Sequence, residues 1–223
     1  MGKALTSFAT SYKKKKGFNE VGIVYDRIES GSGRTEAQAF FTEQLAVLKS
    51  KELLDLSAVA KQFSGLNFLF GLRNVYAEIN ATPNSCAMLM LLAAGKVEHT
   101  LFEITSTCKA LQEMAKPKAT MKEVLDSLTA LDLLGFKQLC GLGAKVYHCT
   151  QEPEQTLYCP TGWLHGVHTH PNGGPVVYGL HKSFFLTGDS DGVARYCMMK
   201  ELLGAAGRDV AKMEQIEALM RGE

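Results

Sequence analysis

The chain has 223 residues, of which 46% are hydrophobic and 21% are charged, and its formal net charge is +1. This composition is ordinary for a globular protein with its own core, and the near-neutral charge argues against a domain that binds nucleic acid through a basic surface. No apolar run reaches the roughly 18 residues that a membrane-spanning helix needs. The six cysteines have no Cys-x-x-Cys spacing, which favours reduced thiols over a zinc module or a disulfide framework.

Residues 1–20 form a basic N-terminal segment that we expect to be flexible. The opening MGKALT fits the loose pattern for N-myristoylation at Gly2, and four lysines follow at Lys13–Lys16. An acyl chain with a basic patch would bind a membrane surface, whereas the lysines alone are a solvated tail. The segment lacks the apolar core of a secretory signal. We therefore expect a cytoplasmic or nuclear protein, with membrane association through Gly2 as the alternative.

Residues 21–143 are predicted to be mainly helical, after a short strand at Val21–Tyr25. Apolar residues recur at helical spacing from Thr35 to Ser64, which indicates two helices with a break near Ser50. The segment Leu66–Ala77 could be a strand or a buried helix, and its aromatic content favours the strand.

The second half of this region continues the helical prediction. Ser85–Ala94 is apolar throughout and ends at a glycine, which is typical of a core helix. An amphipathic pattern follows from Lys96 to Lys116. On that helix His99 and Glu103 would lie four residues apart on one face, a spacing that can chelate a metal and is otherwise that of a solvated surface pair. Thr120 with Glu123 is a capping box that predicts a further helix.

Residues 144–188 predict β structure. Thr156–Cys159 is a strand-like run that enters a Pro-x-Gly turn ending at Gly162, where a positive φ suits glycine. A strand bearing His165 follows, and a cluster of prolines and glycines separates it from a strand at Val176–Phe185. Residues 189–223 are predicted to form C-terminal helices, whose apolar faces either pack on the domain or form a homodimer contact.

The stretch from Gln151 to Phe185 contains a spaced pattern made of Gln151, Pro153, Thr156, Pro160, Gly162, Trp163, His165 and Phe184. This pattern resembles the last part of a JmjC-type cupin domain, the family of Fe(II)- and 2-oxoglutarate-dependent protein hydroxylases and demethylases. The resemblance implies that His165 is the third iron ligand. Ser183 stands where some members have an asparagine that helps to hold the co-substrate, and Thr169 also replaces an asparagine.

The first two iron ligands of that family come as His-x-Asp or His-x-Glu, and none of the six histidines begins such a triplet. Iron of this type takes two histidines and one carboxylate on one face. Glu152, Glu154 or a carboxylate from the helical region could substitute, with His148 or His181 as the second imidazole.

His165, His168 and His170 form a His-x-x-His-x-His pattern that also suggests a metal. Side chains alternate along a strand, so His165 should face away from His168 and His170. His181 lies on the next strand and could pair with one of them. Two of these imidazoles with a carboxylate could bind zinc, iron or nickel, and otherwise they are exposed or half-buried histidines at a hairpin end.

These patterns together predict an α+β fold, with a largely helical N-terminal two-thirds, a JmjC-like antiparallel β segment and C-terminal helices. One functional hypothesis is an oxygenase that uses Fe(II) and 2-oxoglutarate on a protein or a small molecule. The other is a divergent module that keeps the β scaffold, has lost catalysis and binds a protein partner. A local coincidence of strand and turn chemistry is a third explanation of the motif.

Overall fold

The computed structural model describes residues 24–27, 39, 43, 66–72, 74, 76–82, 85–114, 120–174, 176–186, 188–205, 207 and 210–222. The N-terminal segment with Gly2 lies outside the described residues, and so does nearly all of the helical pattern between residues 35 and 64. The expectations for those segments therefore stay predictions.

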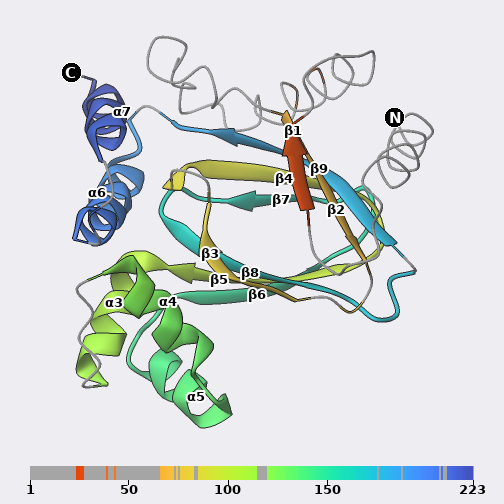
Figure 1. Ribbon diagram of the computed structural model, residues 1–223, viewed down its shortest axis with the longest axis horizontal. Coiled ribbons are helices and arrows are strands. Elements are labelled where there is room, and N and C mark those ends of the chain that lie inside the picture. Colours follow the sequence, from red (N-terminus) through yellow and green to blue (C-terminus); the bar gives the residue numbers. More distant parts are fainter. Residues whose placement is uncertain are drawn as a thin grey trace.

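Two antiparallel sheets lie face to face (Figure 1). The first has the strand order β1-β2-β9-β4-β7, and the second has the order β3-β8-β5-β6. The strands are β1 (Val24–Arg27), β2 (Leu66–Leu72), β3 (Tyr76–Ala81), β4 (Ala87–Ala94), β5 (Val97–Glu103), β6 (Val146–Gln151), β7 (Thr156–Cys159), β8 (Trp163–Thr169) and β9 (Val176–Phe184).

The chain crosses between the two sheets at almost every connection from β2 onward. Only β5 and β6 follow each other within one sheet, and the first strand of this set, β2, pairs with the last, β9. Eight strands wound in this order form a jelly roll. The β segment is therefore not confined to residues 144–188, because β2 to β5 contribute half of the same sandwich.

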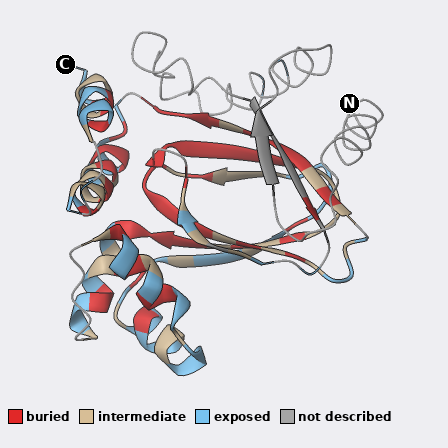
Figure 2. Ribbon diagram, in the orientation of Figure 1, coloured by how far each residue is buried: buried red, intermediate tan, exposed pale blue. Residues whose placement is uncertain are grey.

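The interior of the sandwich is filled from both sheets. Strand residues alternate between two faces, so every second side chain points inward. One apolar cluster lies at each end of the interior, and Figure 2 shows β4, β5, β8 and β9 as mainly buried. The clusters consist of Leu92, Val97, Val167 and Val177, and of Met88, Met90, Leu101, Cys159 and Trp163.

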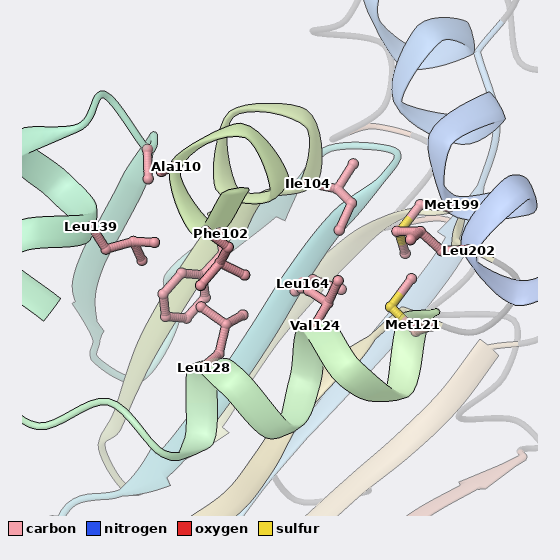
Figure 3. Packing of buried hydrophobic residues seen from close by; sticks show 12 residues of the cluster. Phe102, Ile104, Ala110, Met121, Val124, Leu128, Leu139, Leu164, Met199 and Leu202 are labelled. Atoms are coloured by element: carbon pink, nitrogen blue, oxygen red, sulfur yellow. The ribbon is translucent and has the colours of Figure 1, made fainter. Parts of the chain in front are cut away.

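The helices gather at one end of the sandwich (Figure 1). Leu164 on the outer face of β8 packs with apolar residues of the helices, and Figure 3 shows this cluster. The apolar side chains of the last helix, including Ile216, pack against its neighbouring helix rather than facing outward. None of the described helices combines the length and apolar character needed to cross a bilayer. The helices are α3 (Ile104–Glu113), α4 (Met121–Thr129), α5 (Leu133–Gly141), α6 (Ser190–Gly204) and α7 (Ala211–Arg221).

The prediction of a largely helical N-terminal two-thirds is wrong. The apolar run expected as a core helix is β4, which lies between β9 and β7 and is buried on both faces. A continuous apolar run has no periodicity that would distinguish a helix from a strand buried on both faces. Which of the two forms therefore depends on whether neighbouring strands pair with the segment. The pattern from Lys96 to Lys116 is likewise divided between β5 and α3.

Other local predictions are confirmed. The segment Leu66–Ala77 contains β2 and the start of β3, and the capping box at Thr120 opens α4. Gly162 has a φ of +73° at the turn before β8. Local signals of this kind need no distant partner, which explains why sequence patterns find them.

Substituting Gly162 with alanine should destabilise the fold by about 2–4 kcal/mol, because a positive φ penalises the new side chain and α6 leaves no space for it. A Cβ at Gly162 would overlap the Arg195 Cβ and approach the Arg195 carbonyl carbon to 3.0 Å. Gly143→Ala is the matched control, because Gly143 has a φ of +89° with no atom near its Cβ position. That variant should lose only about 1 kcal/mol. Urea unfolding of both variants measures the difference, and equal losses would contradict the close packing of α6 on the turn.

Candidate functional site

The candidate site is the interior of the sandwich around His165. On β8 the residues Trp163, His165, Val167 and Thr169 face inward and are buried. His165 is 8% exposed. Directly paired residues of antiparallel strands share one face. The directly paired neighbours of His165 are therefore Leu101 on β5, which is buried, and Asn80 on the edge strand β3, which is exposed.

The His165 ring is neutral. Burial lowers its pKa to about 4, against a smaller opposing effect of a hydrogen bond with the Asn80 backbone. Its Nδ1 atom has no hydrogen-bond partner among the described residues, which leaves Nε2 to meet Asn80. A neutral imidazole that donates through Nε2 keeps a lone pair on Nδ1. His165 thus presents an unused acceptor inside the sandwich.

His99 on β5 is a second inward imidazole. Its Nε2 lies 3.0 Å from Oε1 of Gln151, whose Nε2 donates to the Met90 and Gln155 carbonyls at 2.8 Å each. Because the Gln151 amide is fixed in this way, its oxygen accepts, and His99 must donate through Nε2. Burial lowers the pKa of His99 to about 4, and its Nδ1 has no hydrogen-bond partner in the described part of the chain.

His181 on β9 faces the same interior from the other sheet, opposite Met90 of β4. Burial, and to a smaller extent the repulsion that a protonated His165 would exert, lower its pKa to about 3. β8 and β9 lie in different sheets, so His181 does not sit beside His168 or His170 as the hairpin interpretation suggested. Three neutral imidazoles, His99, His165 and His181, therefore share one interior.

Sequence patterns missed His99 because they placed it on a helix. On the strand that the structure has instead, alternation puts Val97, His99 and Leu101 on one buried face. The available signal was the alternating segment VEHTL, which fits a strand as well as it fits a helix.

The buried carboxylate nearest this face is already engaged. Glu103 ends β5, pairs with Trp163 and is 5% exposed. It caps α3 by accepting hydrogen bonds from the backbone nitrogens of Thr105 at 3.2 Å and Ser106 at 2.7 Å. Burial raises its pKa, but these hydrogen bonds outweigh that effect and the net pKa is lowered. The other candidates, Glu152 and Glu154, are exposed in the turn between β6 and β7.

The positions on β3 beside His165 hold neither histidine nor acid. Asn80 is opposite His165, and two residues later Thr82 donates its hydroxyl to the Cys86 carbonyl at 2.6 Å. Among the described residues, no three His, Cys, Asp or Glu side chains come together as metal ligands would. Two imidazoles and a free carboxylate on one face are what such an iron site requires. The residues present around His165 therefore do not fit it.

His168 and His170 lie on the outer face of the second sheet, as alternation predicts relative to His165. His168 Nδ1 is 2.8 Å from Oε2 of Glu98, and His170 Nε2 is 3.7 Å from Oε1 of the same carboxylate. The His168 ring also stacks on Tyr76 with a centroid distance of 3.8 Å. The hydrogen bond with His168 is the main reason why the pKa of Glu98 is lowered. Both nitrogens of His168 are in use, since Nε2 meets Asn74 at 3.3 Å.

Ser183 lies on β9, opposite Met88, and is buried. It faces the interior two residues from His181. Its assignment to a co-substrate stays a prediction, and so do the metal assignments of His165, His168, His170 and His181.

No family model matches the chain, and no curated protein is similar to it at a significant level.

The three buried imidazoles should make the fold sensitive to mild acid. Each has a folded-state pKa below its ordinary value of 6.5. The unfolded chain therefore takes up protons first, and the stability present above pH 6.5 falls as the pH drops toward 4. Each histidine should account for about 2 kcal/mol of loss between pH 6.5 and 5.

The variant His165→Gln, which keeps an N–H donor for Asn80, should lose about 2 kcal/mol less than the wild type over that pH range. The measurement is urea unfolding at pH 7, 6 and 5. Leu164→Ala is the control, because it destabilises the fold without removing a titratable group and should give a curve parallel to the wild type. A parallel curve for His165→Gln as well would show that His165 is not held neutral by burial.

Introducing a second imidazole and a carboxylate beside His165 should create a metal site. In the double variant Asn80→His/Thr82→Asp, an imidazole and a carboxylate join His165 on one face, so it should bind Co²⁺, a redox-stable substitute for Fe(II), with one ion per chain. Titration calorimetry should detect this binding in the variant and not in the wild type. Adding His165→Ala to the pair should abolish it. Binding that does not depend on His165 would contradict the register of β3 against β8.

Proposed function

We propose that this chain is a divergent JmjC-like cupin protein that works as a non-catalytic protein-interaction module. The oxygenase alternative would need Fe(II) and 2-oxoglutarate as cofactors. Both hypotheses share the scaffold and differ in what the interior can do chemically.

Support for the kinship comes from the scaffold and one turn. Jelly rolls are the architecture of the cupins, and the strand order of β2 to β9 is that of a jelly roll. The Pro-x-Gly-Trp-x-His motif adopts the expected corner, with Gly162 at positive φ and His165 directed inward on the following strand. The family's other residues are matched only within Gln151–Phe185.

The observation that carries the non-catalytic proposal is the set of neighbours of His165. Its partners on the two flanking strands are Asn80 and Leu101, and the buried carboxylate of Glu103 is used to cap a helix. An iron centre of the facial type needs donors where these residues stand. Neutral imidazoles without a carboxylate also lack the anionic ligand that helps to hold a divalent cation.

The helical insert between β5 and β6 supports a role in contacts. Leu133 and Leu134 begin α5 and are 71% and 74% exposed. Adjacent large apolar side chains on a surface are a feature of protein contact sites. The insert therefore offers an exposed apolar surface to a protein partner, in addition to the surface of the jelly roll.

Metal analysis and a 2-oxoglutarate turnover assay on the purified chain test the proposal. The wild type and His165→Ala should contain the same background level of iron and consume no 2-oxoglutarate, because no ligand set exists for the substitution to remove. The iron-loaded Asn80→His/Thr82→Asp variant serves as the positive control for metal analysis. Stoichiometric iron and turnover in the wild type, both lost in His165→Ala, would establish the oxygenase instead.

A further inference from the structure

β6 is an open edge of the second sheet. It pairs with β5 through six consecutive residue pairs, from Val97 with Gln151 to Phe102 with Val146, and no described strand lies on its other side. Tyr147 is 59% exposed, and His148 and Thr150 are also exposed. An edge of this kind presents a row of backbone N–H and C=O groups that another strand can use.

The other described edges are blunted in the ways that proteins use against unwanted pairing. The pairing of β3 with β8 shifts register between Ala77 and Asn80, and β7 has four residues and is followed by Pro160. β1 also has four residues. By contrast, β6 has six residues with the sequence VYHCTQ, without Asp, Glu, Lys, Arg or proline and with no break in its register. Edge strands of natural proteins usually carry charges, prolines, register breaks or a short length that prevent pairing with another chain, and β6 has none of the first three.

We infer that β6 pairs with β6 of a second copy of this chain, so that the two second sheets join into one across a twofold axis. Two antiparallel strands related by a twofold axis place residues of the same face opposite each other. Among the registers that meet this condition, the two with the most overlap are centred on a residue. One sets His148 opposite its own copy, and the other sets Cys149 opposite its own copy. In both, no Asp, Glu, Lys or Arg lies within the paired strands, which removes the repulsion between like carboxylates or like amines that opposes self-pairing.

The charges that flank β6 do not oppose this arrangement. Lys145 precedes the strand and Glu152 follows it, and both are exposed. Glu152 forms an ion pair with Lys96 of its own chain at 2.7 Å. In the two registers, Glu152 of the copy falls opposite Ala144 or Val146, and Lys145 of the copy falls opposite Gln151 or Pro153. No two like charges therefore stand directly opposite each other at the ends of the ladder.

The contact is small, because the ladder has only six residues per chain. Interfaces well below the standard size are typical of weak and reversible association. We therefore expect dissociation in the micromolar range, with monomers in dilute solution and dimers in concentrated solution. The inference concerns the sheet edge and does not depend on whether the interior binds a metal.

Sedimentation velocity of the full chain over about 1 to 500 µM tests the proposal at concentrations that bracket weak association. The wild type should shift from its 24.3 kDa monomer to a dimer as concentration rises. Thr150→Lys places a lysine on the exposed face of the edge and should remain monomeric. Thr129→Lys, an equally exposed threonine on α4, is the matched control and should dimerise like the wild type. A wild type that stays monomeric throughout, or a Thr150→Lys variant that still dimerises, overturns the proposal.

Hydrogen–deuterium exchange provides a second measurement that needs no variant. At high concentration, amides within residues 146–151 should exchange several-fold more slowly than at low concentration, because half of them gain a backbone partner. Slowing confined to α7 instead would assign the dimer to the C-terminal helices and overturn the β6 contact.

Discussion

The pairing of β9 with β2 on one side and β4 on the other closes the jelly roll. It joins β9 to a strand more than one hundred residues earlier in the chain and to another more than eighty residues earlier, and every inward side chain of the site depends on it. The approach of β4 to β9 is close, since a Cβ at Gly179 would overlap the Leu91 carbonyl oxygen. The position therefore requires glycine for lack of space rather than for an unusual φ.

Once the sandwich is closed, the chemistry of its interior follows from which inward positions hold which residues. His99, His165 and His181 come from three different strands and two sheets, and burial keeps all three rings neutral. The one buried carboxylate nearby is diverted into the helix cap of α3. The histidines of this interior therefore stand without a free carboxylate close to His165, because Asn80 is paired with His165 and Thr82 lies two residues further along.

Sequence patterns predicted what is locally determined. The turn at Gly162, the strands around it, the capping box at Thr120 and the C-terminal helices all follow from residue types within a few positions of each other. β4 was assigned to a helix because its apolar run becomes a strand only through β9 and β7, which follow it by more than sixty residues. The inward position of His99 on β5 was missed for the same reason. The inward direction of His165 could be predicted from alternation, whereas its neighbours Asn80 and Leu101 depend on register, which no local signal specifies.

The Gln151 side chain ties the two layers together. Its amide reaches the Met90 carbonyl in one sheet and His99 in the other, and it also holds the Gln155 carbonyl in the turn that joins them. Separating the layers along this side would break the link to Met90, whereas the bond to His99 lies within the second sheet. The two layers are thus joined through one side chain where β6 passes into β7, and parting them there would leave buried polar groups of Gln151 and Met90 without partners.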